Sequence, residues 1–389
     1  MAIRFGIDQL IAANPSWKNA SIGLLTNDAA RTSNNIPSRL ALMQAGFNVQ
    51  ILFSPEHGID TKGADGAKMQ DGIDPLTNLP IVSLYADKFA PSATDLSTID
   101  ILVFDIPDAG TRFYTYLWSM TYFIESAATF NKKIYILDRP NPIGGNLSMA
   151  EGPRLDDSIS SFIGRFNIPV KHQCTLGELA LYFNRTKNWN AALEVIACGG
   201  LKRDDLFTKW NQQWIATSPA IQNFNACLLY PGFCFFEATN ISIGRGTSYS
   251  FEWFGVSWMN MDAIVAVCKN MFEGDLEMDI SSLAFKNNNE TKWLPGIHCK
   301  VKDPENYDAV LNGLLLLKIM KDIHPKDFQW APYPTLANPS GNNHLSLLLG
   351  IPNAESIFDL PLQTWLQKIQ ILLRVEDWKK EITAYLLYQ

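Results

Sequence analysis

The sequence predicts an α/β protein in which a parallel-sheet domain is followed by a smaller α+β domain. The chain has 389 residues, enough for about two domains of ordinary size. Its first half alternates short apolar runs with helical patterns, as successive βαβ units do. Beyond about residue 218 the sequence becomes rich in proline, glycine and aromatic residues, which indicates a second domain.

The expected strands are short and apolar and show little alternation, as parallel strands covered on both faces require. They are Ser21–Thr26, Val49–Ser54, Ile81–Tyr85, Ile101–Asp105, Lys133–Asp138 and Ala192–Ala197. A glycine C-cap signal closes a helix at Ile36–Gly46, and Tyr116–Asn131 gives a longer amphipathic helix. Thr175-Leu176-Gly177-Glu178 reads as a capping box before a helix at Leu179–Asn184.

These elements place the first domain at residues 1–218 and the second at residues 219–389. Within the second domain, helical patterns cover Ala309–Lys321 and Pro361–Leu373. No internal repeat or low-complexity tract interrupts either part.

Composition excludes several classes of protein. The formal net charge of −7, without any run of Lys or Arg, argues against nucleic acid as the partner. No run of about 18 apolar residues is present, so no membrane span is expected. The six cysteines show no CxxC pair and no zinc spacing, which is compatible with a reducing compartment.

The amino-terminal segment Met1–Asp8 enters a folded pattern at once and leaves no space for a signal peptide. The chain as it stands is therefore expected to be cytoplasmic. The alternative is a periplasmic or secreted protein whose leader has been removed. The oligomeric state is left open by the sequence.

The segment Ile51–Gly58 carries the clearest functional signal. It reads as a buried strand that stops at Pro55-Glu56-His57-Gly58, where packing gives no reason for two ionisable side chains. Open α/β sheets bind ligands beyond the carboxyl ends of their strands. Glu56 is therefore expected to be an active-site acid, with His57 as a positioning residue that contacts substrate.

Two further strands end in charged turns. Asp105, Asp108, Arg112 and Tyr114 follow the fourth expected strand, and Asp138-Arg139-Pro140-Asn141 follows the fifth. If the strands are neighbours, Glu56 and these charged residues line one crevice. A structural interpretation stands beside this one, in which the aspartates cap helices or pair with the arginines.

The second domain contributes a cluster with Glu237, Asn240 and Arg245, the last within Gly244-Arg245-Gly246-Thr247. Such a loop exposes backbone N–H groups and an arginine fork to an anion. The chain lacks GxGxxG, the P-loop, the GxSxG elbow and HExxH, so no cofactor is expected. Glu56 and His57 could hold Mg²⁺ but show no recognised spacing, so no metal is expected either.

Taken in order, several segments resemble the NamZ-type exo-β-N-acetylmuramidases, long catalogued as a domain of unknown function. They are FSPEHG at Phe53–Gly58, PIVSLY at Pro80–Tyr85, FDIPDAGTRFYTY at Phe104–Tyr116, LDRPNP at Leu137–Pro142, Glu151-Gly152-Pro153, TLGELA at Thr175–Ala180, Tyr230-Pro231-Gly232 and TNISIGRGT at Thr239–Thr247. The resemblance implies a Rossmann-like domain, a smaller second domain and an active site in the cleft between them.

The implied activity is release of N-acetylmuramic acid from the non-reducing end of peptidoglycan fragments, with Glu56 at the position of the family's catalytic glutamate. Glycoside hydrolysis also needs a base or nucleophile, for which Asp105, Asp108 and Glu237 are candidates. Tyr114 is a candidate to stabilise the developing positive charge. Arg112, Arg139 and Arg245 suit the lactyl carboxylate. Asp138, Asn141 and Asn240 complete the expected substrate contacts.

Two alternatives remain at this point. One is a metal-assisted phosphoryl or ester hydrolase that uses the crevice of Asp105, Asp108 and Asp138. The other is a non-catalytic muropeptide-binding protein, suggested by departures from the family pattern such as Asn342-Asn343-His344.

Overall fold

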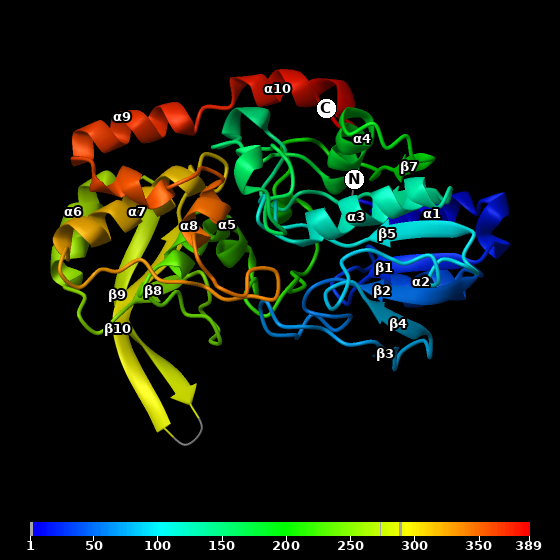
Figure 1. Ribbon diagram of the computed structural model, residues 1–389, viewed down its shortest axis with the longest axis horizontal. Coiled ribbons are helices and arrows are strands. Elements are labelled where there is room, and N and C mark those ends of the chain that lie inside the picture. The colour runs from blue at the N-terminus through cyan, green and yellow to red at the C-terminus, as the bar shows by residue number, and fades with distance from the viewer. Residues whose placement is uncertain (1–2, 273, 288–289) are drawn as a thin grey trace.

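The computed structural model describes residues 3–272, 274–287 and 290–389, so Met1 and Ala2 lie outside the described residues. The amino-terminal part is built around a seven-stranded sheet, and the carboxy-terminal part holds a three-stranded sheet with helices packed on it (Figure 1). The expected α/β class with a smaller second domain is confirmed.

The large sheet has the strand order β3-β4-β2-β1-β5-β6-β7. Its strands are β1 (Ile22–Thr26), β2 (Val49–Ser54), β3 (Gly72–Ile73), β4 (Pro80–Ser83), β5 (Ile101–Asp105), β6 (Lys133–Leu137) and β7 (Leu193–Ile196). Every neighbouring pair is parallel except β3 and β4. The chain passes from β1 outward to β2 and β4, then crosses to β5 on the other side of β1. Ligands of open α/β sheets bind at such a switch point.

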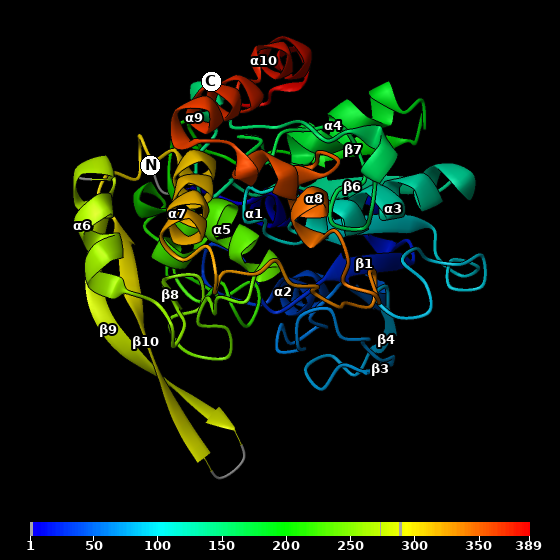
Figure 2. The same ribbon diagram turned by 60° about the vertical axis from the view of Figure 1, so that its left-hand side comes forward.

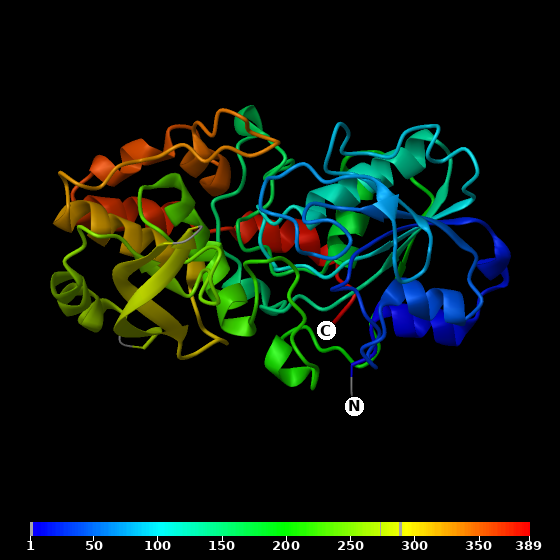
Figure 3. The same ribbon diagram turned by 90° about the horizontal axis from the view of Figure 1, so that it is seen from below.

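Helices cover both faces of this sheet. The helices α1 (Gly6–Ala13) and α2 (Ser38–Gln44) pack on one face, and α3 (Tyr116–Thr129) and α4 (Leu176–Thr186) pack on the other (Figure 3). Leu24 and Leu25 of β1 point into the two different cores, which explains why the strands are apolar throughout.

Most of the predicted elements of the first domain are confirmed. The strands β2 and β5 occupy the predicted residues, and β1, β4, β6 and β7 differ by one or two residues at one or both ends. The two-residue strand β3 was not predicted. The capping box is present, because Thr175 accepts a hydrogen bond from the Glu178 N–H and Glu178 accepts one from the Thr175 N–H. Helix α4 begins directly after this cap, at Leu176.

The second domain packs its helices against a small antiparallel sheet with the order β8-β10-β9. Its elements are α5 (Phe224–Phe233), β8 (Trp253–Gly255), α6 (Met261–Met271), β9 (Leu276–Asn287), β10 (Glu290–Val301), α7 (Ala309–Ile323), α8 (His344–Leu349) and α9 (Leu362–Leu372). The predicted helices at α7 and α9 are confirmed. The hairpin β9–β10, which projects from the body in Figures 1 and 2, was not predicted.

The last residues return to the first domain. Helix α10 (Glu376–Ile382) follows α9, and Trp378 Nε1 donates a hydrogen bond of 2.9 Å to the His172 carbonyl. The Tyr388 hydroxyl donates one of 2.6 Å to Asp138 Oδ2. The carboxy-terminal end of the chain thus lies on the first domain (Figure 1). The proposed boundary after residue 218 stays a prediction.

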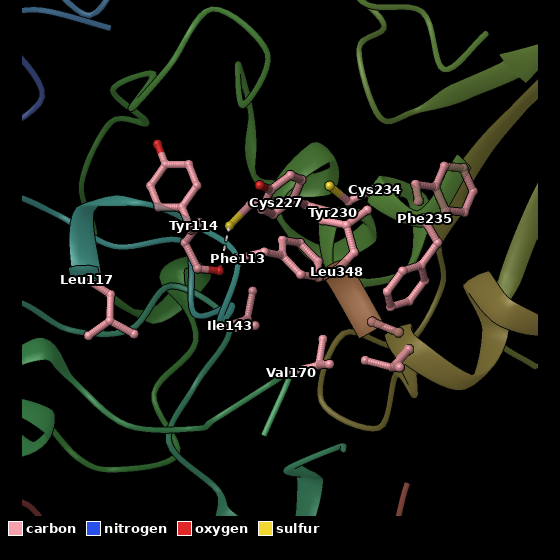
Figure 4. Packing of buried hydrophobic residues seen from close by; sticks show 14 of the residues in the cluster. Phe113, Tyr114, Leu117, Ile143, Val170, Cys227, Tyr230, Cys234, Phe235 and Leu348 are labelled. Atoms are coloured by element: carbon pink, nitrogen blue, oxygen red, sulfur yellow. Dashed lines mark hydrogen bonds between the residues drawn. The ribbon is translucent and has the colours of Figure 1, made fainter. Parts of the chain in front are cut away.

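One apolar core runs from the first sheet into the second domain. Figure 4 shows Phe113 and Tyr114, from the turn after β5, beside Cys227 and Tyr230 of α5 and Leu348 of α8. A continuous core of this kind holds two domains as one body. All six cysteines are buried and free. Among the described residues, no helix has both the length and the apolar character that a bilayer crossing demands.

Arg112 lies at the centre of this junction with no exposed surface. Nη1 donates to the carbonyls of Pro153 and Ile168, and Nη2 donates to the Leu348 carbonyl in the second domain. Burial lowers the pKa of Arg112 to about 9, so it stays charged at neutral pH. A side chain at Gly350, where φ is +80°, would meet Nη2 at 2.4 Å. Arg112 therefore stabilises the contact between the domains and does not serve the predicted role of binding substrate.

We expect Arg112→Lys to lower the free energy of unfolding by about 3 kcal/mol or more, because lysine cannot reach the three carbonyls and leaves buried acceptors unpaired. Thermal unfolding at pH 7 measures the change. The exposed Arg374→Lys is the matched control, with an expected effect within about 0.5 kcal/mol. Equal melting temperatures for the two variants would contradict this role.

Candidate active site

Two separate hollows open at the carboxyl edge of the large sheet. The first, here called the cleft, has a volume of about 560 Å³ and lies between loops that follow β2, β4 and β5 and residues of the second domain. The second, here called the side hollow, has a volume of about 660 Å³ and lies over the ends of β1, β5 and β6. The sequence analysis expected a single crevice.

Glu56 lies at the floor of the cleft with 5% of its surface exposed. Strand β2 ends at Ser54, and His57 and Gly58, with φ of +66° and +73°, turn the chain sharply after it. Glu56 Oε1 accepts a hydrogen bond of 2.9 Å from the Gly66 N–H, and Oε2 accepts one of 2.6 Å from the Thr115 hydroxyl. The carboxyl group is thus held in one orientation.

Burial raises the pKa of Glu56 above its ordinary value near 4.5. The charge of His57 opposes this rise and the charge of Asp65 adds to it, while the bonds from Thr115 and Gly66 oppose it. Glu56 therefore keeps a proton to higher pH than an exposed glutamate. This is the property that a general acid needs.

His57 is fixed beside Glu56. Its Nδ1 donates a hydrogen bond of 2.8 Å to the Gly63 carbonyl, which leaves Nε2 without the proton in the neutral ring. Left-handed backbone is uncommon for a residue other than glycine and often marks a functional turn. These features agree with the predicted positioning role of His57.

Asp65 is a cleft residue that the sequence analysis missed. The Tyr333 hydroxyl donates a hydrogen bond of 2.8 Å to its Oδ2, and Arg245 Nη2 lies 3.5 Å from its Oδ1. Burial opposes ionisation of Asp65, but the charges of Arg245 and His57 and the bond from Tyr333 outweigh it. The pKa of Asp65 therefore lies below its usual value near 3.8.

Arg245 reaches the cleft from the second domain. Its Nε donates to Glu237 Oε1 at 2.5 Å, Nη2 pairs with the same carboxylate, and the guanidinium stacks over the Phe251 ring at 4.8 Å. His344 Nε2 lies 3.5 Å from Glu237 Oε2. Among the described residues, Arg245 Nη1 makes no hydrogen bond, so this arm of the fork can bind an anion.

Glu56, His57 and Asp65 are also the group that could hold a metal ion. One ligand atom from each lies within 4.8 Å of the other two. Their oxygen and nitrogen donors suit a hard divalent cation. The carboxylates of Asp105, Asp108 and Asp138, predicted as an alternative metal crevice, form no such group among the described residues.

Five of the predicted site residues line the cleft, namely Glu56, His57, Tyr114, Glu237 and Arg245. Tyr114 is held there by its hydroxyl, which donates a hydrogen bond of 2.6 Å to Thr217 Oγ1. Their roles in catalysis stay predictions.

The strand-end charges after β5 and β6 lie elsewhere, so the prediction of one shared crevice was wrong. Asp105 is fully buried against Arg139, whose Nε and Nη2 donate to it at 2.5 and 3.0 Å. Asp138 accepts hydrogen bonds from the Gly177 N–H and the Thr175 hydroxyl at the start of α4. The structural interpretation of these pairs is the one the geometry supports, because their charges are satisfied inside the fold.

The remaining predicted contacts are corrected in the same way. Arg112 binds carbonyls at the domain junction. Asn141 donates to the Cys174 carbonyl, and Asn240 donates to the Asp327 carbonyl, so both amides stabilise loops. Asp108 and Arg139 do line a hollow, but it is the side hollow.

Other cleft residues came without a usable signal. Tyr333 lies far along the chain in a loop with no distinctive pattern, and His344, at the start of α8, was noted only as a departure from the family pattern. Thr115 reads as an ordinary helix-start residue. For Asp65 a signal did exist, because Gly58, Gly63 and Gly66 surround it in a loop that the fold folds back over Glu56.

The fold and the cleft define a class: a two-domain α/β protein with a protonatable glutamate and an ionised aspartate facing one interdomain cleft, as glycosidases have. Residues 22–225 and 228–388 match the models of the amino-terminal and carboxy-terminal parts of the exo-beta-N-acetylmuramidase NamZ. The chain belongs to the NamZ exo-β-N-acetylmuramidase family.

Individual relatives agree with this assignment. The peptidoglycan beta-N-acetylmuramidase NamZ of Bacillus subtilis (strain 168) is 32% identical over 345 residues, which cover 87% of this chain and 82% of that protein. Two crystal structures of DUF1343 family proteins from Bacteroides fragilis NCTC 9343 superpose with TM-scores of 0.86 and 0.72 at 26% and 27% identity. In both, 100% of this chain and 99% of the other are covered.

We expect Glu56→Gln to stabilise the protein at neutral pH. Because the folded state holds the Glu56 proton more tightly than the unfolded state, stability falls as pH rises from the ordinary value near 4.5 towards the raised pKa. Glutamine keeps both hydrogen-bond partners and removes this loss, roughly 1.4 kcal/mol for each unit between the two pKa values.

Melting temperatures of wild type and Glu56→Gln between pH 4 and 8 test this expectation. The advantage of the variant should appear above pH 4.5 and vanish below it. The exposed Glu305→Gln serves as a control with no expected trend. Parallel curves for wild type and Glu56→Gln would show that the carboxyl group carries no such penalty.

Proposed function

We propose that this protein is a glycosidase that releases N-acetylmuramic acid from the non-reducing end of peptidoglycan fragments. Membership of the family and the identity to the Bacillus subtilis enzyme support this activity. The observation that carries the residue assignment is the pair Glu56 and Asp65, two neighbouring carboxyl groups whose pKa values are displaced in opposite directions. Such pairs mark the acid and its partner in glycoside hydrolysis.

Glu56 serves as the general acid in this proposal. It donates its proton to the glycosidic oxygen while the bond from that oxygen to the anomeric carbon breaks. The bonds from Gly66 and Thr115 hold the carboxyl group in place, so little reorganisation is needed as the proton moves. In the second half of the reaction the Glu56 carboxylate takes a proton from the attacking water.

Asp65 serves as the second carboxylate. Its ionised form is stabilised by Arg245, His57 and Tyr333. As the glycosidic bond breaks, an Asp65 oxygen acts as nucleophile and forms a bond to the anomeric carbon, and the attacking water later displaces it. Ligand atoms of Asp65 and Glu56 lie within 4.8 Å of each other. Inverting enzymes separate their carboxyl groups by about 6.5–9.5 Å to admit water, and retaining enzymes by about 5–5.5 Å. The geometry therefore favours retention of the anomeric configuration.

Arg245 is the proposed contact for the lactyl carboxylate of muramic acid. Glu237 orients the guanidinium and Phe251 supports its face, while Nη1 stays available to the ligand. Of the other arginines considered from the sequence, Arg112 is committed to carbonyls at the domain junction, and Arg139 lines the side hollow rather than the cleft. The recognition of muramic acid thus depends on a residue that the second domain supplies.

The metal-assisted alternative loses its predicted crevice, because Asp105 and Asp138 are satisfied by other groups. A metal-assisted reaction can still be tested in the cleft, because Glu56, His57 and Asp65 are grouped closely enough to hold a metal ion. Hydrolysis that is insensitive to EDTA favours the acid and nucleophile pair over a metal-bound water. Tight binding of a muramide without turnover by the wild type would favour the non-catalytic alternative.

The central experiment follows hydrolysis of a 4-nitrophenyl N-acetyl-β-muramide. We expect Glu56→Gln and Asp65→Asn each to lower kcat by about 10²–10⁴-fold, because each removes one half of the acid and nucleophile pair. The exposed Glu305→Gln should match wild type. Proton NMR of the first sugar released by wild type should show the β-anomer. Initial release of the α-anomer would refute the retaining pair, and full activity of Glu56→Gln would refute the acid.

Arg245→Lys tests substrate selection. Lysine keeps the charge beside Glu237 but loses the planar fork, so preference for a muramide over the matching N-acetylglucosaminide, which lacks the lactyl group, should fall about tenfold. The measurement is the ratio of kcat/KM for the two substrates. An unchanged ratio with lower overall activity would show that Arg245 only positions Asp65 and does not bind the lactyl group.

A further inference from the structure

The side hollow is a separate feature of the same sheet edge. It lies over the carboxyl ends of β1, β5 and β6, at the switch point between β1 and β5 where ligands of open α/β sheets bind. A wall divides it from the cleft, because Thr217 lines the hollow, Tyr114 lines the cleft, and a hydrogen bond of 2.6 Å joins them. Neither Glu56 nor Asp65 lines it.

Asp108 is a buried carboxylate among the residues that line the side hollow. Its side chain is 4% exposed, and neither carboxylate oxygen has a hydrogen-bond partner among the described residues. His172 is its nearest charge partner, with Nε2 3.3 Å from Oδ2. His172 Nδ1 accepts from the Cys174 N–H, which places the ring proton on Nε2, and Nε2 makes no hydrogen bond among the described residues. An unpaired buried carboxylate is costly. Both of its oxygens are closed to solvent, so a ligand in the hollow reaches the neighbouring side chains first.

Arg139 offers a hydrogen-bond donor that a ligand in the side hollow can use. Its Nε and Nη2 are taken by Asp105, Ser38 and the Arg31 carbonyl, whereas Nη1 makes no hydrogen bond among the described residues. Arg139 is 93% buried, with 7% of its surface exposed, and it lines the hollow. The hollow therefore presents one donor that the fold has left unused, and the Asp108 carboxylate lies buried beneath its surface.

Aromatic rings form the opposite side. Phe207, Trp210 and Trp214 line the hollow together, and the Phe207 ring meets the rings of both tryptophans edge-on at 5.1 and 4.9 Å. Trp214 Nε1 already donates to the Ile221 carbonyl, so the indole offers its apolar face rather than its N–H group. Gln212 and Gln213 lie at the same wall and add amide groups.

We propose that the side hollow is a second binding site that takes a single pyranose sugar ring. A pyranose has an apolar C–H face that packs on an indole and hydroxyl groups that both donate and accept. Those hydroxyls match Arg139 Nη1 as donor and the amide oxygens of Gln212 and Gln213 as acceptors. This site is independent of the proposed catalysis, because it shares neither carboxylate with the cleft.

The test uses the full wild-type chain, because glucose and N-acetylglucosamine have no glycosidic bond that the cleft could hydrolyse. Glucose and N-acetylglucosamine are titrated by saturation-transfer NMR and by tryptophan fluorescence, and we expect a Kd of about 1 mM. Trp214→Ala should weaken binding about tenfold or more, through the lost apolar face. The exposed Trp293→Ala, on the projecting hairpin, is the matched control and should bind as the parent does.

Gln213→Trp provides a second test in case Trp214→Ala unfolds. The Gln213 side chain is exposed and lines the hollow, so a tryptophan at this position should block the hollow. Loss of binding in Gln213→Trp with an unchanged melting temperature supports the site. Sugar binding that survives Gln213→Trp, that disappears in the cleft variant Tyr333→Ala, or that is absent up to about 50 mM overturns it. Tighter binding of adenosine than of either sugar overturns the assignment to sugars.

Discussion

The contact of Arg245 with Asp65 is the interaction on which the cleft depends. The two residues come from different domains, and their side chains approach within 3.5 Å only when the domains are packed together. Arg245 and Tyr333 keep Asp65 ionised, and the charge of Asp65 in turn helps Glu56 to hold its proton. The opposite shifts of the two carboxyl groups are therefore a property of the junction between the domains.

That junction is rigid for separate reasons. An unbroken apolar core crosses it, and Arg112 binds carbonyls on both sides. The carboxy-terminal segment adds a further tie, because Tyr388 reaches Asp138 at the end of β6. A fixed junction lets Glu56 and Asp65 meet with little reorganisation, which is how preorganised sites stabilise a transition state.

The charged strand ends divide into two kinds once the fold is known. Asp105 and Asp138 are satisfied by Arg139 and by the start of α4, so they stabilise the loops. Glu56 is hydrogen-bonded too, but it lines the cleft, and Asp108 lies at the side hollow with no hydrogen-bond partner among the described residues. Sequence alone treats all four as equal, because each is an acid that follows an apolar strand.

The sequence by itself determined the parallel sheet, most of its strand limits, the cap of α4 and the position of Glu56. These follow from local signals, namely apolar runs of strand length, capping residues and an acid with no packing role. Only the tertiary structure decided which charges meet. Asp65, Tyr333 and Arg245 are separated by long stretches of chain. The glycines around Asp65 indicate a tight loop, but they do not show that Tyr333 and Arg245 meet it. Charge pairing depends on distances in space, and these are set by the packing of one domain on the other.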